Sequence, residues 1–266
     1  MVRENQRVVL VTGASSGIGL ACARYLGERG FRVYGISRRP APSTPVVTSL
    51  IADVTDGRSV ERAIAAVVAR EGRLDIVVNN AGMGIAGAVE DTSIEDASRQ
   101  LDVNLLGAFR VCRAALPIMR GRRSGYIVNI GSIGGLIALP YQGMYSASKF
   151  ALEGLSEALR MEVRPFGIRV VLIEPGDHKT DFTHNRQIIE NTYGKPCEAA
   201  LARAARDEQN GPGPEQIARL LYGIINLRNP RLRYSTGPIF QRAAVWLKRL
   251  LPNSLVEYGV RLYFGL

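Results

Sequence analysis

Four short runs of apolar, mostly β-branched residues recur along the chain, separated by segments with helical spacing. They span residues 8–11, 76–78, 127–130 and 170–173. Because each run is continuously apolar rather than alternating, it is typical of a strand covered on both faces. Strand and helix in repeated alternation predict a parallel sheet, and right-handed crossovers then place helices on both faces. Such a doubly wound fold binds its ligands beyond the carboxyl ends of the strands.

The segments between these runs carry helical patterns, and together they indicate one folding unit. One helical pattern follows Thr55-Asp56, and another follows Ser93, which suits a helix N-cap. Two connections rich in proline or glycine, residues 40–45 and 207–214, do not separate two complete strand–helix patterns. We therefore predict a single α/β domain over residues 1–266, built on a doubly wound parallel sheet.

Two segments depart from the alternation of strand and helix. Residues 177–214 follow a strand end with weak periodicity and are predicted to form a mobile helical flap over the site, with a surface insertion as the alternative. Residues 238–266 form a C-terminal extension, in which 239–251 carry apolar residues at helical spacing. From Arg228 onward there are seven basic residues and one acid. A basic amphipathic helix suits peripheral contact with an anionic membrane, but packing on its own domain or on a partner subunit is the commoner case.

Composition excludes several classes of protein. The net charge is +10, but most basic residues are scattered among acids, and no basic-aromatic strip indicates nucleic-acid binding. Residues 1–7 are polar with no apolar stretch behind them, so we expect a cytoplasmic chain. Cys22, Cys112 and Cys197 share no metal-ligand spacing, so neither a disulfide nor a bound metal is expected.

The first apolar run leads into a glycine-rich turn, and a helical pattern follows. Residues 12–19 read Thr-Gly-Ala-Ser-Ser-Gly-Ile-Gly. Glycines serve any sharp turn, but between a strand and a helix start they also let backbone N–H groups approach a pyrophosphate, whose charge the helix N-terminus favours. The turn therefore predicts dinucleotide binding. The predicted contacts are Gly13, Ser15, Ser16, Gly17, Ile18 and Gly19.

A second strand, residues 31–36, ends in Ser37, Arg38 and Arg39, where a fold that binds NAD usually has an acid for the ribose 2′-hydroxyl. Paired guanidinium groups suit a 2′-phosphate, which accepts bidentate charge-assisted hydrogen bonds. These residues therefore predict NADP(H) rather than NAD(H), unless one arginine merely points to solvent.

Tyr145 and Lys149 lie four residues apart at the start of a long apolar-periodic segment, so a helix would place them on one face. A lysine cation beside a phenol stabilises the phenolate and lowers the tyrosine pKa, which makes the phenol a usable acid or base. Alone, this pair is most often a solvated helix pair. The catalytic interpretation of the pair is supported by residues 79–82, Asn-Asn-Ala-Gly, after one strand and by Ser132 after another.

With these motifs the chain resembles the short-chain dehydrogenase/reductase family in its single-domain form, over most of residues 6–240. The resemblance is carried by Thr12, Gly13, Gly17, Gly19, Asp53, residues 79–82, Asn104, Ser132, Tyr145, Lys149 and Pro175-Gly176. It implies a Rossmann-type sheet of about seven strands and hydride transfer between a nicotinamide and a carbonyl or alcohol carbon. It also implies a homo-oligomer, a dimer or a tetramer.

The resemblance further implies a role for each matching residue. Tyr145 would donate a proton to the ketone oxygen, or take one from the alcohol, and Ser132 would hydrogen-bond that oxygen. Lys149 would hold the nicotinamide ribose, and Asn104 would anchor a water that links the lysine to solvent. The other implied cofactor contacts are Asp53 and Val54 at the adenine, Asn80, Ala81 and Gly82 beside the ribose, and Pro175, Gly176 and Thr180 at the carboxamide.

His178 departs from the family pattern, which usually has an aliphatic residue there. We expect cofactor binding to survive this change, because the contact is commonly made through the backbone. A histidine near a reactive carbonyl could act as a general acid, but Tyr145 already fills that role. We therefore predict that His178 is a surface-loop residue and that Asp177 is a loop or entrance residue.

The segment from Ser132 to Tyr141 must pass the reacting centre, and it offers almost only apolar groups. With Met83, Ile85 and Phe182 it favours a lipophilic carbonyl or alcohol substrate, as in the steroid and retinoid members that the chain resembles, although apolar loops also pack for structural reasons. We expect an NADP(H)-dependent oxidoreductase. The alternative is an NADPH-binding sensor or scaffold without turnover, which would not require the serine, tyrosine and lysine set.

Overall fold

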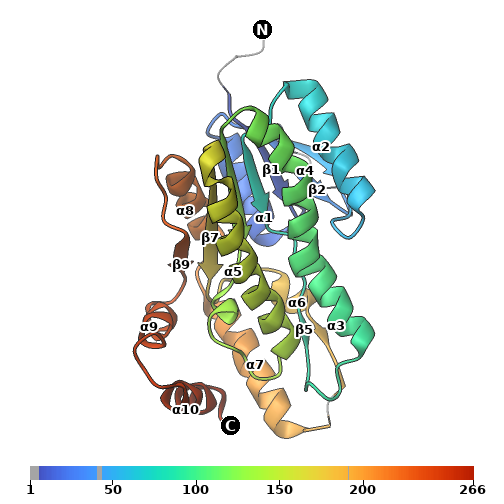
Figure 1. The fold of residues 1–266 in the computed structure, drawn as a ribbon. Helices are drawn as coiled ribbons and strands as arrows, with labels where there is room; N and C mark the ends of the chain where they lie inside the picture. The colour runs from blue at the N-terminus through green and yellow to red at the C-terminus, as the bar shows by residue number, and fades with distance from the viewer. Residues whose placement is uncertain (1–5, 41–43, 191) are drawn as a thin grey trace.

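The main sheet of the computed structural model is parallel and carries the predicted apolar runs at its centre. The structure describes residues 6–40, 44–190 and 192–266. Within them the sheet has seven strands in the order β3-β2-β1-β4-β6-β7-β9, all paired in parallel (Figure 1). The strands are β1 (Val8–Thr12), β2 (Arg32–Ser37), β3 (Val47–Ile51), β4 (Ile76–Asn79), β6 (Gly125–Ile130), β7 (Ile168–Pro175) and β9 (Arg233–Thr236). The predicted Rossmann-type fold is confirmed.

The chain reverses its direction of travel across the sheet between β1 and β4. From β1 it runs outward through β2 to β3, and it then returns to the other side of β1 for β4, β6, β7 and β9. In an open parallel sheet, loops diverge at such a switch point and leave a crevice at the carboxyl ends of the strands. The two strands that border the crevice are β1 and β4.

Helices cover both faces of the sheet, because neighbouring residues of each central strand point to opposite sides. On β1, Val9 and Val11 belong to the apolar core shared with α1 (Gly17–Gly27) and α8 (Glu215–Ile225). Val8 and Leu10 belong to the core on the opposite face, shared with α2 (Gly57–Glu71), α4 (Gly107–Gly121) and α5 (Gly143–Val163). Continuous apolar runs were the correct signal for strands covered on both faces.

The predicted helix starts are present. The carboxylate of Asp56 accepts a hydrogen bond from the backbone N–H of Arg58 at the start of α2. Ser93 accepts one from the N–H of Asp96, at 3.0 Å, at the start of α3 (Ile94–Leu101). From α3 the chain continues through one π-helical turn, Asp102–Leu106, directly into α4.

The described part of residues 177–214 contains two helices and one short strand. These are α6 (Phe182–Asn185), β8 (Gln187–Ile188) and α7 (Lys195–Asn210). Strand β8 pairs in parallel with β5 (Ile85–Ala86), which follows the β4 loop. The segment is therefore joined to the rim of the crevice.

The C-terminal extension forms two helices beyond the β9 edge of the sheet, α9 (Ile239–Leu247) and α10 (Asn253–Phe264) (Figure 1). Phe264 packs against Ala200 and Ala204 of α7, and the Tyr263 hydroxyl donates a 2.5 Å hydrogen bond to Asp207. Among the described residues no helix has the length and the apolar character that crossing a membrane requires.

Candidate active site

The glycine turn after β1 is shaped by close backbone packing. Gly13 and Gly17 have φ angles of +65° and +52°, in the left-handed region that favours glycine. A Cβ at Gly19 would lie 2.3 Å from the carbonyl oxygen of Gly13, so only glycine fits where α1 meets the turn. Such a bare turn at a helix N-terminus fits a pyrophosphate. Gly19 itself does not line the cavity that Gly13, Ser15, Ser16, Gly17 and Ile18 border, and its contribution is the packing of the helix on the turn.

Thr12 joins the two strands at the switch point. Its hydroxyl oxygen accepts hydrogen bonds from the backbone N–H groups of Asn80, at 2.9 Å, and Ala81, at 2.8 Å. The side-chain amide of Asn80 donates to the Thr12 carbonyl oxygen at 3.0 Å. These bonds hold the loop after β4 against the glycine turn, so that Asn80, Ala81 and Gly82 border the same cavity.

The ends of β2 and β3 supply the side of the cavity that carries charge. Ser37, Arg38 and Arg39 line it together with Asp53 and Val54. The carboxylate of Asp53 accepts hydrogen bonds from the Thr55 backbone N–H and hydroxyl at 2.9 and 2.8 Å. Both arginines are exposed, and neither forms an ion pair with an acid in the described part of the chain. Their guanidinium groups are therefore available to an anion.

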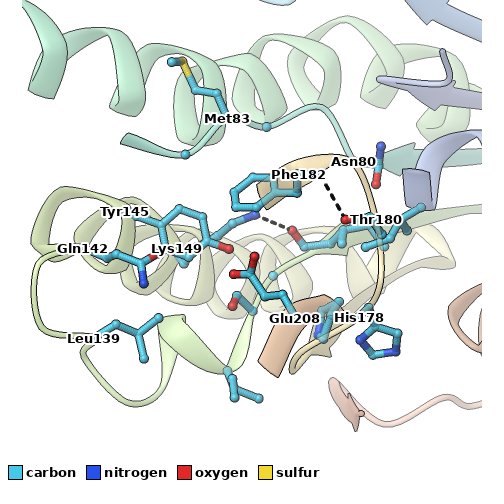
Figure 2. Close-up of a pocket in the computed structure, with 18 of the residues that line it drawn as sticks. Asn80, Met83, Leu139, Gln142, Tyr145, Lys149, His178, Thr180, Phe182 and Glu208 are labelled. Atoms are coloured by element: carbon cyan, nitrogen blue, oxygen red, sulfur yellow. Dashed lines mark hydrogen bonds between the residues drawn. The ribbon is translucent and has the colours of Figure 1, made fainter. Parts of the chain in front are cut away.

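Tyr145 and Lys149 share one face of α5 (Figure 2), and Ser132, two residues after the end of β6, lines the same cavity. Ser132 is hydrogen-bonded to the Tyr145 phenol, and this contact lowers the tyrosine pKa. Burial has the larger effect, so the pKa of Tyr145 lies above its ordinary value. The phenol therefore carries its proton at neutral pH.

Lys149 does not prime the phenol in the way that the sequence predicted. Its ammonium group is buried, lies 5.9 Å from the centroid of the Tyr145 ring, and donates a 2.9 Å hydrogen bond to the carbonyl oxygen of Ile130. Burial lowers the pKa of Lys149 to about 8. The expected lowering of the tyrosine pKa is therefore wrong for this arrangement, because desolvation of the buried phenol has the largest effect and raises the pKa.

Asn104 lies in the π-helical turn between α3 and α4, where it is buried. Its side-chain oxygen accepts a hydrogen bond from the Met83 N–H at 2.8 Å. Its amide donates to the Met83 carbonyl oxygen and to the Ser148 hydroxyl, both at 3.0 Å. Asn104 does not border the cavity. It ties the β4 loop to α5, and single π turns of this kind are frequent at functional sites.

The sites for the two ends of a dinucleotide are connected by one cavity of about 1240 Å³. It runs from the arginines at β2, past Tyr145, to the helices of the C-terminal extension. Pro175, Gly176 and Thr180 line it after β7, and the Thr180 side chain lies against Gly17. Along the cavity the arginines come first, the glycine turn follows, and the polar groups at Tyr145 come last. This spatial order fits a nicotinamide dinucleotide.

The inner part of the cavity is mostly apolar, as predicted. Ile133, Ile137, Leu139, Met83 and Phe182 line it, and the Phe182 ring lies 5.7 Å from the Tyr145 ring, centroid to centroid (Figure 2). Several predicted members do not line it, and Ile85 and Tyr141 are two of them. Ile85 is buried in β5, and Tyr141 packs against Cys197 and Leu201 of α7.

His178 is not the surface residue that the sequence predicted. Its side chain is buried, with 5% of its surface exposed, although its edge borders the cavity. One ring nitrogen lies 3.0 Å from the Gly176 carbonyl oxygen, and the other 3.1 Å from the Gln216 side-chain oxygen. Polar partners on α8 and β7 account for this burial, and they lie 38 and 2 residues away in the sequence.

Sequence reasoning missed a buried ion pair on the flap. Arg186 is paired with Glu208 of α7, which also accepts a hydrogen bond from Thr183. The Glu208 carboxylate and the Tyr145 hydroxyl point toward the same part of the cavity (Figure 2). Asp177 borders this region too, and burial together with the neighbouring carboxylates raises its pKa to about 6. Residues this far apart in sequence give no local pattern.

Chemically, the site combines a cavity that fits a nicotinamide dinucleotide with a protonated phenol. A carbonyl oxygen near Tyr145 and Ser132 would meet two hydroxyl groups, and donors aimed at an oxygen that gains negative charge stabilise the transition state more than the ground state. This arrangement suits reduction of a carbonyl group or the reverse oxidation of an alcohol.

Known proteins share both the sequence and the fold. The sequence profile of the family described as short chain dehydrogenase matches residues 7–190. The 3-ketodihydrosphingosine reductase of Bacteroides thetaiotaomicron is 42% identical, with 98% of each chain covered. The 17-beta-hydroxysteroid dehydrogenase type 1 of Homo sapiens is 35% identical over 88% of this chain and 78% of its own. The crystal structure of a short-chain dehydrogenase from Streptomyces avermitilis has a TM-score of 0.82 at 33% identity, covering 92% of this chain and 93% of that one.

Proposed function

Because the chain belongs to the short-chain dehydrogenase/reductase family, whose oxidoreductases bind nicotinamide cofactors, we propose that it transfers a hydride between NADP(H) and a lipophilic ketone or secondary alcohol. The single observation that carries this proposal is the joint placement of Ser132, Tyr145 and Lys149 on one cavity with the glycine turn. When bound, the nicotinamide supplies or accepts the hydride.

The residues of the chain handle the proton and the charge. Tyr145 is protonated at neutral pH because burial raises its pKa, so in reduction it donates the proton to the substrate oxygen. Ser132 hydrogen-bonds the same oxygen. In oxidation the phenol must first lose its proton before it can take the proton of the alcohol, so we infer that oxidation speeds up as the pH rises, whereas reduction starts from the protonated phenol already present at neutral pH.

The preference for NADP(H) is supported by Arg38 and Arg39. Both guanidinium groups lie at the end of β2 on the wall of the cavity, and neither is neutralised by an acid among the described residues. A 2′-phosphate at this place would accept charge-assisted hydrogen bonds from them. A ribose 2′-hydroxyl would instead leave two cations without an anionic partner.

A lipophilic substrate is supported by the lining of the inner cavity. Apolar side chains from the segment after Ser132, from Met83 and from Phe182 surround the space beside Tyr145. The hydrocarbon part of a lipophilic substrate would pack against these side chains, whereas a small acid would meet the carboxylates of Glu208 and Asp177 in the same space. The names of two relatives, 3-ketodihydrosphingosine reductase and 17-beta-hydroxysteroid dehydrogenase type 1, denote substrates of this character. We therefore propose 3-ketodihydrosphingosine as the first ketone to assay.

Replacement of Tyr145 by phenylalanine tests the proposal against the rival, an NADPH-binding protein without turnover. Tyr145→Phe keeps the ring but removes the proton donor, so turnover should fall by at least about 10²-fold while NADPH binding is retained. Tyr126→Phe is the control, because its hydroxyl is remote and bonds to Leu227. Ketone reduction would be followed by nicotinamide absorbance, and NADPH binding by fluorescence. Failure of the unaltered chain to turn over any lipophilic ketone or alcohol would favour the sensor.

We also propose that the chain forms a homo-oligomer through α4 and α5. Phe109 on α4 and Phe150 on α5 are large apolar side chains that remain 45% and 40% exposed. Helix faces of this kind suit a symmetric contact between identical subunits. Light scattering of the purified chain would measure the number of subunits, and a monomer at micromolar concentration would contradict the proposal.

A further inference from the structure

Large apolar side chains are exposed along both helices of the C-terminal extension and along their connection. We call this surface, made by residues 239–266, the C-terminal face. Its exposed members are Ile239, Phe240, Trp246, Leu247, Leu250, Leu251, Leu255, Tyr258, Leu262 and Leu266. Trp246 is the single tryptophan of the chain, and it is 61% exposed. So many exposed apolar residues on adjacent helices mark an interaction surface.

The C-terminal face is continuous with the wall of the substrate cavity. Leu247, Leu251 and Leu255 line the cavity and are also exposed to solvent. Val256 and Val260 of α10 line the cavity as well. A lipophilic molecule could pass from the surface to the cavity along apolar side chains alone. The tail of such a molecule would then not have to cross water.

The charge on this face is positive. Arg242, Arg249 and Arg261 are exposed and make no ion pair with the described residues, while the one acid of the extension is Glu257. Lys248 reaches inward and donates a hydrogen bond to the Leu136 carbonyl oxygen. Exposed arginines beside a tryptophan and leucines are the pattern of a helix that lies in the interface of an anionic bilayer.

We propose that the C-terminal face docks on the surface of an anionic lipid bilayer, and that the lipophilic substrate enters the cavity there, between α9 and α10, directly from the membrane. This inference rests on the lipophilic substrate proposed above. A second copy of the chain fits this face less well, because an isologous contact would bring the same unpaired arginines together. Anionic headgroups complement them.

Vesicle binding by the full chain tests the docking step. The probes are vesicles of phosphatidylcholine alone and vesicles with about 30% phosphatidylglycerol, an anionic fraction large enough to attract basic segments. We expect the chain to co-sediment with the anionic vesicles and much less with the neutral ones. The variant W246D/L250D changes two exposed residues that do not line the cavity, and it should lower the bound fraction at least about tenfold.

The control variant, I51D/I94D, alters two side chains of similar exposure on other surfaces. It should bind vesicles as the unaltered chain does. Equal binding to neutral and anionic vesicles, or equal loss in both variants, would overturn the proposal. The proposal would also be overturned if neither the unaltered chain nor the variants bound vesicles and light scattering showed that W246D/L250D turns a dimer into a monomer. The C-terminal face would then be a subunit contact.

Kinetics separate this inference from the proposed function. W246D/L250D should reduce a short, water-soluble ketone as fast as the unaltered chain, but it should reduce a long-chain ketone presented in vesicles at least about tenfold more slowly. Equal rates on the vesicle-held ketone would overturn the entry route while leaving the proposed function intact. Absence of turnover on every ketone, even in detergent, would refute the proposed function whatever the vesicle binding.

Discussion

Glu153 lies one helical turn beyond Lys149 on α5, and its carboxylate raises the pKa of that lysine, which burial lowers. Glu153 is itself buried. It accepts a 2.8 Å hydrogen bond from Arg233, which also pairs with the exposed Glu157. Burial and the neighbouring Glu174 raise the pKa of Glu153 to about 7. The charge state of Lys149 is thus coupled to a carboxyl group that does not border the cavity.

This coupling predicts a shift in the pH dependence. Lys149 is charged below its pKa of about 8 and loses its proton above it, so kcat/KM for NADPH should fall as the pH rises through about 8. In Glu153→Gln the lysine loses the carboxylate that raises its pKa, so this fall should begin at lower pH. Glu157→Gln removes another partner of Arg233 and should leave the profile unchanged. Identical profiles for all three chains would show that Glu153 does not tune the lysine.

Asn104 should contribute to both stability and activity. Asn104→Ala removes its three hydrogen bonds to Met83 and Ser148 and leaves the half-buried Met83 N–H without its acceptor, which should lower the free energy of unfolding by about 1–3 kcal/mol. Urea unfolding measures this change. Asn229→Ala, at an exposed asparagine, is the control and should stay within about 0.5 kcal/mol of the unaltered chain. A loss of activity with no loss of stability would assign Asn104 a role other than positioning the β4 loop.

Arg38 should decide the choice of coenzyme. Arg38→Asp replaces a cation on the cavity wall by an anion that repels a 2′-phosphate, so NADPH affinity should fall by at least about 10²-fold, and NADH affinity much less. Titration of both coenzymes by fluorescence measures the ratio. Arg58→Asp, at an exposed position outside the cavity, changes the net charge equally and should leave the ratio unaltered. An equal fall for both coenzymes in Arg38→Asp would contradict the 2′-phosphate assignment.

Two glycine substitutions should have opposite effects. In Gly19→Ala the new Cβ would lie 2.3 Å from the Gly13 carbonyl oxygen, so the turn must shift, the fold should lose about 1–3 kcal/mol, and NADPH affinity should fall. In Gly154→Ala the new Cβ on α5 meets nothing within 4 Å, and the higher helix propensity of alanine should stabilise the fold by about 0.5–1 kcal/mol. Thermal unfolding with and without NADPH measures both effects. Unchanged coenzyme affinity in Gly19→Ala would show that the turn tolerates a side chain.

The central strands were predictable from sequence because they are buried on both faces, and β1 is apolar throughout as far as Val11. The strands β3 and β9 gave no such signal. They are the two edge strands, and most of their residues are partly or fully exposed, so their sequences lack a continuous apolar run. The resemblance to the family was needed to expect a sheet of that width.

The candidate site was predictable where its chemistry is local in sequence. The glycine turn and the pair Tyr145 and Lys149 follow from spacing on one element. The burial of His178 and the pairing of Arg186 with Glu208 arise from contacts between separate elements, which spacing does not report. The error in the tyrosine pKa has the same origin, because the depth of burial is set by packing.

The π-helical turn at Asp102–Leu106 sets the rotational phase between α3 and α4. Each residue advances an α-helix by about 100°, so one extra residue within a turn changes which side chains before and after it face the same direction. Deleting a single residue there would give a regular helix with better hydrogen bonding, yet it would swing Asn104 away from the Met83 backbone. At this point of the chain, a regular α-helix and the contact of Asn104 with the Met83 backbone are therefore mutually exclusive.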